Sequence, residues 1–465
     1  MSLIICLAAL ITLIVLAYRG YSVILVAPLI AMAAVLCTEP SAVAPAYSGL
    51  FMKKAASFVQ NYFPVFLLGA IFGKLIEASG AARTIVLAIT RLLGAQRAIL
   101  AITLVGMILT YGGVSVFVVV FAIYPFAAEM FRTADIPKRL IPATIALAAL
   151  TGTLDALPGT PQIANIIPIA FLKTDGFAAP VLGIVGSLFS FCLGLAYLEW
   201  ERRRAKRAGE GYGVGHVQEP EIIDAENGPS LPLSLLPLLI VAIGNRFALL
   251  AITRFYGEDA TAILNVRMAA SPITESVATN AGIWAVEAAL LAGVIVAIVI
   301  AWRRILPRLA ELTHVAIGGA LLAALNTASE YGFGAIIAAL PGFTLIGDTL
   351  SGIRNPLLNV AVITNVLSGM TGSSSGGLSL TLGAFADRFI AMAHASHIPL
   401  EAVHRISAMA SGGMDTLPHN GVIVTLLLVC GLTHRQAYKP ILGITAIKTG
   451  AVFVAVAFYE LTGLV

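Results

Sequence analysis

The chain has 465 residues, of which 59% are hydrophobic and only 11% are charged, and its formal net charge is +4. A soluble globular domain carries about 25% charged residues, so this composition excludes an ordinary soluble protein and predicts a chain that crosses a lipid bilayer many times. The basic residues lie in short loops instead of one patch, which excludes a nucleic-acid-binding protein.

Apolar segments follow one another along the whole chain, and most are close to the ~20 residues that an α-helix needs to span a bilayer. They run over 2–18, 21–37, 61–80, 98–131, 139–171, 177–198, 232–251, 284–302, 314–341, 356–393, 402–432 and 440–463. The first has no basic start and no small-residue cleavage site, so it is predicted to be a retained span. The stretches 44–60, 82–94 and 343–355 are candidate surface helices.

Segments 98–131 and 356–393 are too long for one span and too short for two spans with a loop. Each is interrupted near its middle, by Tyr111-Gly-Gly-Val-Ser115 and by Thr371-Gly-Ser-Ser-Ser-Gly-Gly377. Non-helical backbone at membrane depth is tolerated only where protein buries it or where it lines a wet cavity. We therefore predict two re-entrant helical hairpins.

The positive-inside rule supports this topology. If both hairpins enter and leave on one side, most basic residues fall on the same side as the loop Glu199–Arg207, which is then cytoplasmic. The result is ten full spans, two hairpins and both termini outside. The exceptions are Lys53, Lys54, Arg254, Arg388 and Arg405.

The two halves of the chain resemble each other at an offset of about 261 residues. Phe72-Gly73 returns as Phe333-Gly334, and Thr151-Gly-Thr-Leu-Asp-Ala-Leu-Pro158 returns as Ser411-Gly-Gly-Met-Asp-Thr-Leu-Pro418. Four predicted crossings separate the repeats, so they are antiparallel. Inverted repeats with discontinuous helices are typical of secondary transporters.

The predicted fold class is therefore an all-α polytopic membrane protein with two inverted-topology repeats, each containing a re-entrant hairpin and a broken transmembrane helix. Residues 1–60 are predicted to form N-terminal scaffold spans, and residues 61–198 the first repeat, with its broken helix at 139–171. A cytoplasmic linker is predicted at 199–231, followed by central spans with an external loop at 232–313. The second repeat is predicted at 314–465, with its broken helix at 402–432.

The hairpin tips and the helix breaks are the predicted substrate site. Glycine exposes backbone N–H groups, serine adds hydroxyls, and a helix N-terminus attracts anions, so the tips suit a carboxylate. The alternative is that glycine and serine only allow close helix packing. The candidate substrate-binding residues are Gly112, Gly113, Ser115, Thr160, Gln162, Asn165, Thr371, Ser373, Ser374, Ser375, His419 and Asn420.

Three acidic residues lie inside apolar segments, where a charge is costly and marks a functional site by default. Asp155 and Asp415 precede the prolines that break the two helices. Each is a candidate proton carrier, a helix cap, or both, since Asp is a preferred N-cap. Glu330 is a third proton-coupling candidate, with a permanently protonated cavity-wall carboxyl as the alternative.

The four cysteines lie in apolar runs without a CxxC motif or a His/Cys cluster. This pattern predicts no disulfide, no metal site and no cofactor. A membrane enzyme would need a catalytic motif such as HExxH or GxSxG within a span. The sequence contains no HExxH, and its one GxSxG match, Gly372-Ser-Ser-Ser-Gly376, is the glycine- and serine-rich hairpin tip described above, so the chain is predicted not to be an enzyme.

Several stretches resemble the gluconate permease (GntP) family of bacterial proton symporters, within the wider ion-transporter superfamily. They are Gly20–Pro28, Glu330–Gly334, Asn365–Ser373 and Ala410–Gly421. The resemblance implies a homodimer in the bacterial inner membrane, with scaffold and transport domains and elevator-like movement. It also implies uptake of a gluconate-like hydroxy-monocarboxylate with protons, and within the family the chain looks more like the β-hydroxybutyrate permease branch.

Two transporter functions remain open. One is proton-coupled symport of a small hydroxylated monocarboxylate, and the other is a sodium-coupled or citrate-type carrier of di- or tricarboxylates. Few Arg and Lys lie within the apolar segments, which disfavours a multiply charged substrate. The tips carry Gly-Gly-Val-Ser and Gly-Ser-Ser-Ser where the dicarboxylate carriers have Ser-Asn-Thr, which disfavours a sodium site.

Overall fold

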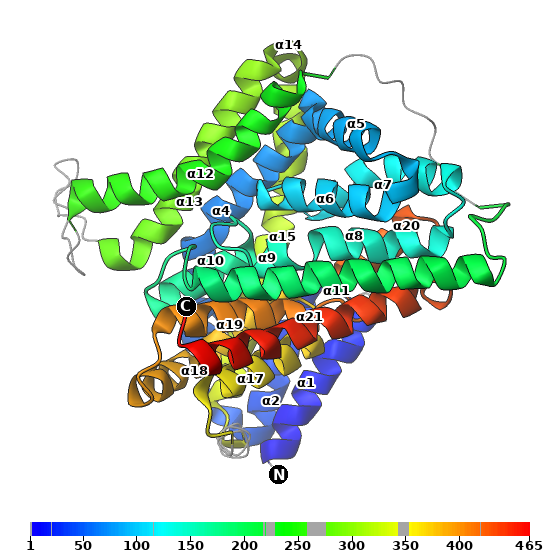
Figure 1. The fold of residues 1–465 in the computed structure, drawn as a ribbon. Coiled ribbons are helices and arrows are strands. Elements are labelled where there is room, and N and C mark those ends of the chain that lie inside the picture. Colours follow the sequence, from blue (N-terminus) through cyan, green and yellow to red (C-terminus); the bar gives the residue numbers. More distant parts are fainter. Residues whose placement is uncertain are drawn as a thin grey trace.

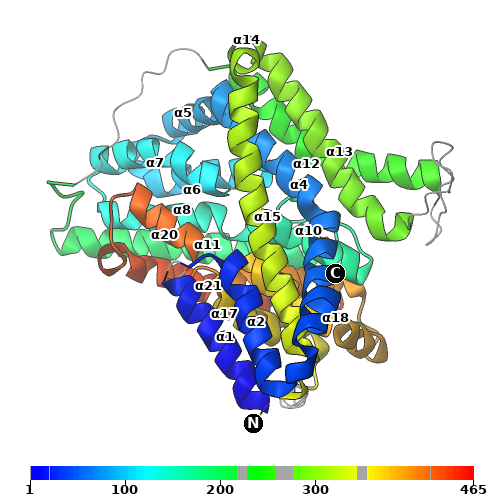
Figure 2. The same ribbon diagram turned by 180° about the vertical axis from the view of Figure 1, so that it is seen from behind.

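The computed structural model describes residues 2–19, 21–114, 116–216, 219, 228–257, 276–342, 353–418 and 420–465, and every regular element in these ranges is a helix (Figures 1 and 2). Six of the described helices are long and apolar enough to cross a membrane: Pro40–Ser79, Pro180–Arg207, Leu231–Tyr256, Asn280–Ile300, Trp302–Ala339 and His434–Thr462. The prediction of a polytopic α-helical membrane protein is confirmed. The exact number of crossings stays a prediction.

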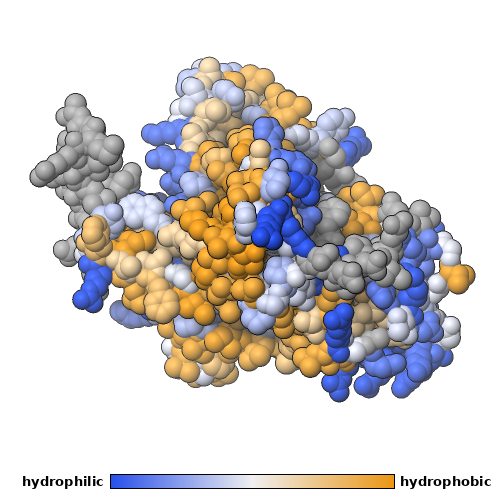
Figure 3. Space-filling model, turned by 90° about the horizontal axis from the view of Figure 1, so that it is seen from above, coloured by the Kyte–Doolittle hydropathy of each residue, from blue (hydrophilic) through white to orange (hydrophobic). Residues whose placement is uncertain are grey.

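The outer surface fits a lipid environment. Large apolar side chains of α12 (Leu231–Tyr256) are exposed, among them Leu239, Ile243 and Phe247. Figure 3 shows broad apolar areas on one face of the molecule, with hydrophilic groups beside them near its centre and toward its margins. Soluble proteins rarely expose large contiguous apolar patches, so this surface is one that lipid would cover.

The N-terminal part is more continuously helical than predicted. After α1 (Ser2–Tyr18) and α2 (Val23–Thr38), helical turns η1 (Pro40–Ala42), α3 (Val43–Ala46) and η2 (Tyr47–Phe51) lead without a break into α4 (Met52–Ser79). The stretch 44–60 is therefore the start of a long helix and not a separate surface helix. Lys53 and Lys54 lower the hydropathy of this part of the sequence without interrupting the helix, and Pro45 lies in its first turns, where a missing backbone N–H is tolerated. The separate helix α5 (Ala81–Leu93) corresponds to the stretch 82–94.

Helices α4 and α15 (Leu309–Ala339) carry the matching Phe-Gly pairs and pack against each other in opposite directions (Figure 2). At one end, Arg304 donates to the carbonyl oxygen of Ser79 at 3.2 Å. At the other end, a Cβ on Gly332 would lie 2.9 Å from the carbonyl oxygen of Phe51. Arg304 belongs to α14 (Trp302–Ile305), which leads through η5 (Leu306–Arg308) into α15. The inverted relation of the two halves is therefore visible in this pair.

A second matched pair, α11 (Pro180–Arg207) and α21 (His434–Thr462), crosses the molecule side by side (Figure 1). Tyr197, late in α11, lies against Gly443, early in α21, whereas Gly186 faces Ala451. The two helices are therefore also antiparallel. Helices α12 and α13 (Val277–Ile300) pack on each other at the edge of the fold.

The linker begins later than predicted, because α11 extends to Arg207 and takes up residues 199–207. Good helix formers fill this stretch, and the ion pairs Glu199–Arg202 and Glu201–Arg204 lie one turn apart. Glu210, just beyond the helix, accepts two hydrogen bonds from Arg139, at 2.6 and 2.9 Å. The bond to the Arg139 guanidinium lowers the pKa of Glu210 below its ordinary value.

Each predicted hairpin is a pair of helices joined by a few residues. In the first half, η3 (Ala95–Arg97) and α6 (Ala98–Tyr111) precede α7 (Val116–Thr133). In the second half, α17 (Pro356–Thr371) is followed by α18 (Ser374–Ala395). The predicted interruptions fall between the paired helices, and the re-entry of these pairs into the membrane stays a prediction.

Both predicted broken helices are interrupted at the proline motifs. The first consists of η4 (Lys138–Leu140), α8 (Ile141–Ala149), the short α9 (Gly152–Asp155) and α10 (Ile163–Leu172). The second consists of α19 (Leu400–Gly413) and α20 (Gly421–Val429). Proline lacks a backbone donor and does not fit a helix interior. Residues 156–162, and residues 414–418 with Asn420, therefore lie in two breaks whose polar backbone needs partners.

Candidate functional site

The first hairpin tip is tied to the first break by side chains of both. Gln162 donates from its amide to the carbonyl oxygens of Thr110 and Val114, at 2.8 and 3.2 Å. The Tyr111 hydroxyl donates to the carbonyl oxygen of Pro158 at 2.9 Å. These bonds satisfy carbonyls that the interruption of two helices leaves without helical partners.

The second tip is tied to the second break by Asn420. Its amide donates to the carbonyl oxygen of Gly372 at 2.8 Å, and its side-chain oxygen accepts from the backbone N–H groups of Val422 and Ile423. Asn420 is thus the N-cap of α20. Its role as a substrate ligand stays a prediction, while the structure gives it the capping role that the sequence analysis considered for Asp155 and Asp415.

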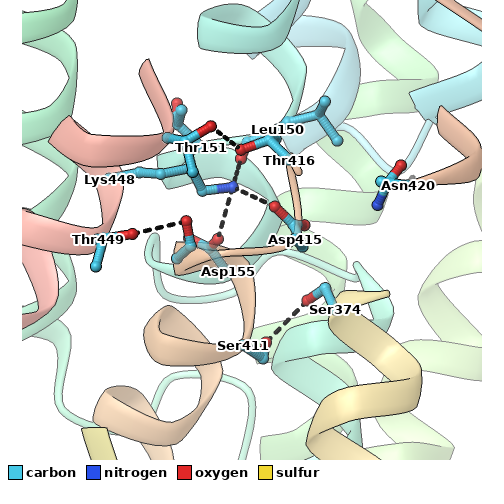
Figure 4. A network of polar contacts seen from close by, with 12 residues as sticks. Leu150, Thr151, Asp155, Ser374, Ser411, Asp415, Thr416, Asn420, Lys448 and Thr449 are labelled. Carbon is cyan, nitrogen blue, oxygen red and sulfur yellow. Dashed lines mark hydrogen bonds and ion pairs between the residues drawn. The ribbon is translucent and has the colours of Figure 1, made fainter. Parts of the chain in front are cut away.

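Asp155 and Asp415 do not cap a helix; instead, both face Lys448 of α21 (Figure 4). The Lys448 ammonium lies 2.8 Å from Asp415 Oδ1 and 3.9 Å from Asp155 Oδ2, and it also donates to the carbonyl oxygen of Leu150. All three residues are at most 4% exposed. The breaks of the two repeats therefore meet at one buried ionic cluster.

Lys448 is absent from the residues predicted from the sequence. The available signal was a lysine within the apolar segment 440–463, which by the rule applied to the acidic residues marks a functional site. Its ammonium lies at the C-terminal end of α8, where the free carbonyl of Leu150 attracts a cation.

Arg405 is a second buried cation, and it is fully enclosed. Its guanidinium donates to the carbonyl oxygens of Ala178 and Gly176 and, at 2.9 Å, to the side-chain oxygen of Asn165. Arg405 therefore lies inside the protein and is not a loop residue, which removes it from the exceptions to the positive-inside rule. Among the described residues, Arg405 and Lys448 are the buried cations within the predicted apolar segments 402–432 and 440–463, and Lys138, just before segment 139–171, is buried as well.

Thr160 and Asn165 are also used within the protein. The Thr160 hydroxyl donates to the carbonyl oxygen of Thr153, and the Asn165 amide donates to the carbonyl oxygens of Thr160 and Gly176. Both side chains are completely buried. In this conformation they hold the first break together, and their predicted contact with a substrate remains a prediction.

The serines of the second tip surround the start of α18. Ser373 is its N-cap and accepts from the N–H of Gly376, while Ser374 shares a 2.8 Å hydrogen bond with Ser411 of α19. Ser375 lies 3.4 Å from the hydroxyl of Thr327. Thr371 donates within the tip, to the carbonyl oxygens of Ser368 and Ser373. Residues 373–375 are half-buried, so this tip retains some access from outside.

Glu330 lies against the same tip. A Cβ on Gly376 would overlap the Glu330 carboxyl, which places that carboxyl at the first turn of α18. Glu330 is 6% exposed, and its Oε2 atom has no hydrogen-bond partner among the described residues. A buried carboxylate without partners is costly, so a proton or a ligand group would stabilise it.

The first tip is packed more tightly. A Cβ on Gly112 would lie 2.5 Å from Leu238 of α12, and Gly113, at φ +92°, lies close to Pro161 and to Leu290 of α13. Glycine is needed here for both space and backbone conformation. The packing interpretation therefore describes Gly112 and Gly113 in this conformation. Ser115 and His419 lie outside the described residues.

No group of three or more His, Cys, Asp or Glu side chains that could hold a metal ion occurs within the described ranges. The polar chemistry of this part of the chain consists instead of paired charges, hydroxyls and free backbone groups. These are groups that bind anions and protons.

The model of the "GntP family permease" matches residues 1–277, more than half of the chain. The chain belongs to the GntP family. This confirms the resemblance seen in the sequence motifs, and it makes the protein a membrane transporter by family. Among relatives, this permease is 51% identical over 476 residues, the full length of both chains, to the "uncharacterized transporter YxjC" of Bacillus subtilis. It is 34% identical over 149 residues to an "uncharacterized transporter" of Haemophilus influenzae, covering 31% of this chain and 33% of that one.

Two solved transporter structures are similar to this permease. MtrF of Neisseria gonorrhoeae, from a class of antimetabolite efflux pumps, matches with a TM-score of 0.50 and 15% identity, covering 87% of this chain and 82% of that one. The YdaH transporter of Alcanivorax borkumensis matches with a TM-score of 0.48 and 16% identity, covering 89% and 88%. The likeness to MtrF concerns the fold alone.

Proposed function

We propose that this GntP permease is a secondary active symporter that takes up a small hydroxylated monocarboxylate together with protons. The substrate class is that of gluconate-like sugar acids or 3-hydroxybutyrate. The observation that carries the proposal is the meeting of both helix breaks at buried acidic groups, with each break fastened to its own hairpin tip. Buried ionisable groups at the interface of two repeats are the usual location of coupling sites in secondary transporters.

The substrate carboxylate binds at the second tip. Ser373, Ser374 and Ser375 are half-buried and lie at the positive end of α18, whereas Gly112 and Gly113 of the first tip are buried by α12 and α13. The first tip would contact the substrate only after a movement that separates it from Leu238. Hydroxyl donors and a helix N-terminus suit a single carboxylate without a dedicated cation.

Protons are the proposed coupling ion, with Asp155, Asp415 and Glu330 as the residues that carry them. Each is buried, and each has a carboxyl oxygen either unpartnered or paired with Lys448. Protonation neutralises such groups and lowers the cost of moving them through an apolar environment.

Family membership supports further proposals on assembly. We propose a homodimer in the bacterial inner membrane with both termini outside, in which the two hairpins and broken helices move as a transport domain against a scaffold. A sodium-coupled carrier of di- or tricarboxylates is the second candidate. It is less favoured because Arg405 and Lys448, the buried cations described above, are already engaged by the protein's own oxygens.

Uptake in proteoliposomes tests the proposal. Labelled D-gluconate, 3-hydroxybutyrate, succinate and citrate are offered under a pH gradient without sodium, and under a sodium gradient at equal pH. We expect accumulation of a hydroxy-monocarboxylate under the pH gradient alone. Accumulation of citrate or succinate driven by sodium would favour the second candidate, and accumulation of none of the four would reject the proposed substrate class.

A further inference from the structure

The Asp155–Lys448–Asp415 cluster combines three charged groups from three different elements. Asp155 ends α9 in the first repeat, Asp415 follows α19 in the second, and Lys448 comes from α21. Figure 4 shows the Lys448 nitrogen between the two carboxyl groups. No single span holds this cluster, so it forms only when the two breaks are in place.

The two carboxyl groups are not equivalent. Asp415 is in hydrogen-bond contact with Lys448 at 2.8 Å, whereas Asp155 Oδ2 is 3.9 Å away and has no hydrogen-bond partner among the described residues. Gly412 of α19 passes so close that a Cβ there would overlap Asp155 Oδ2. One ammonium therefore lies near two buried carboxyls and is within hydrogen-bond distance of only one of them.

The surrounding elements bring little further charge to the cluster. Arg405 is the nearest other cation, but its guanidinium faces the backbone oxygen of Asp155, at 3.5 Å, and is bound by Ala178, Gly176 and Asn165. His404 beside it is bonded to Thr174 and Asn165. The helices α6, α8, α10 and α17 contain no Asp, Glu, Lys, Arg or His. The remaining charged or titratable residues of the packed elements are Lys138, Arg139, Glu199–Arg207, Asp387, Arg388, His394, Glu401, His434, Arg435, Lys439 and Glu460.

We propose that Asp155, Lys448 and Asp415 form a single proton-binding site shared by the two repeats, with Lys448 as the positioning residue that pairs with whichever carboxylate is unprotonated. Two buried carboxylates that share one ammonium carry a net charge of −1, and one proton neutralises the cluster. In the geometry described here the proton belongs on Asp155, because Asp415 holds the ammonium. When the ammonium moves to Asp155, the proton on Asp155 passes to Asp415, on the other repeat, and the cluster stays neutral.

This site rests on the proposed function and adds to it the place where the transported proton binds. Because the site contains one carboxyl from each repeat, proton binding affects both repeats. Whether Lys448 pairs with Asp415 or with Asp155 is linked to the contact between the two breaks. Binding or release of one proton therefore changes the interaction between the repeats, which a symporter requires of its coupling ion.

Infrared difference spectroscopy on the reconstituted full-length protein tests the site without any substrate. We expect a protonated-carboxyl band that titrates with pH in the wild type and is lost in Asp155→Asn. In Lys448→Met the band should persist to higher pH, because two neighbouring carboxylates without a cation resist double ionisation. Lys448→Arg should titrate like the wild type, as should Lys439→Met, which removes an exposed lysine from the same helix.

A Lys448→Met chain that fails to fold is replaced by Lys448→Met with Asp415→Asn, which restores the net charge of −1 and leaves Asp155 as the sole carboxyl. This variant should keep one titrating band. The proposal is overturned if Lys448→Met titrates like the wild type, or if neither Asp155→Asn nor Asp415→Asn changes the spectrum.

Transport separates this proposal from the proposed function. With labelled 3-hydroxybutyrate or D-gluconate, accumulation by Lys448→Met under a pH gradient should fall roughly 10-fold or more, whereas accumulation by Lys439→Met should equal that of the wild type. A wild type that ignores the pH gradient would contradict the proposed function, and the infrared result would still decide the proton site. A wild type that responds, beside a Lys448→Met variant that accumulates equally well, would overturn the role of Lys448.

Discussion

Gln162 donates its side-chain amide to the backbone carbonyl of Thr110 at 2.8 Å, and this bond joins a helix break to a hairpin tip 52 residues earlier in the chain. The same amide reaches Val114 on the far side of the tip. One side chain thus spans the interruption between α6 and α7. Asn420 does the equivalent for Gly372 in the second repeat.

Gln162→Leu should therefore loosen the first tip. The substitution keeps the size of the side chain and leaves the carbonyls of Thr110 and Val114 without this donor, at a cost of about 1–3 kcal/mol. We expect a lower thermal unfolding temperature in detergent and faster hydrogen exchange of amides in residues 109–114. Gln60→Leu, an exposed change on α4, is the matched control, and equal effects of the two substitutions would contradict the bridging role.

Ser374→Ala should weaken substrate binding roughly 10-fold or more, because a hydrogen bond to a charged group is worth about 1.5–3 kcal/mol. Calorimetry with 3-hydroxybutyrate or D-gluconate measures the loss. Ser22→Ala is the control, since Ser22 makes no capping bond at the start of α2. Unchanged affinity in Ser374→Ala would assign this serine to its bond with Ser411 alone.

Glu330→Gln should extend substrate binding to higher pH. An ionised carboxylate at the first turn of α18 repels an incoming anion, and a glutamine keeps the neutral form at every pH. Thermal-shift titration with the same acids from acidic to alkaline pH measures the effect. Glu311→Gln changes an exposed carboxyl near the start of the same helix and should leave the pH profile as it is. A wild-type profile in Glu330→Gln would exclude this carboxyl from the site.

Arg405→Met should destabilise the fold by ~3 kcal/mol or more, because several buried carbonyl oxygens lose a charged donor. Arg405→Lys should recover only part of this stability, since a lysine cannot reproduce the planar fork that spans Ala178 and Asn165. Thermal unfolding in detergent compares both variants with Arg435→Met, an exposed change on α21. Full rescue by lysine would mean that charge alone, and not geometry, is required.

The attachment of the linker should depend on pH through Glu210. Its pKa is lowered in the folded protein by the hydrogen bond from Arg139. This contact therefore stabilises the folded state at pH values above the ordinary carboxyl value of 4.5, and the contribution is lost as the pH falls through the lowered pKa. Limited proteolysis of residues 208–216 should accelerate only in strongly acidic buffer. Glu210→Gln should be cleaved rapidly at neutral pH as well, and a wild-type cleavage rate would contradict the anchoring role.

Much of this architecture could be predicted from local sequence. The two tips and the two breaks follow from segment length, glycine, serine and proline, and the repeated Asp-x-Leu-Pro motif indicates that the halves are related. The extension of α4 to residue 52 could not be predicted from hydropathy, because Lys53 and Lys54 interrupt the apolar pattern without interrupting a helix.

The ionic cluster was harder to predict, because periodicity assigns a residue to a face of a helix and does not say which helix lies opposite. Lys448 and Asp155 are 293 positions apart, and only the antiparallel packing of α11 with α21, beside α8 and α9, brings them together. Asn420 illustrates a different limit. The same amide suits a substrate or a helix cap, and its geometry alone shows that it caps α20.

The antiparallel pair α11 and α21 has one further consequence. Offsets of 261 and 260 residues relate Phe72 to Phe333 and Asp155 to Asp415, so the counterpart of Lys448 is Ser187 or its neighbour Leu188. Ser187 lies against Gly152, and its buried hydroxyl has no partner among the described residues. The two copies therefore differ chemically at their centre, with an ammonium on one and an uncharged side chain on the other. Two conformations that exchanged the roles of the copies would therefore differ in energy, and a symmetric duplicate would lack this preference for one of them.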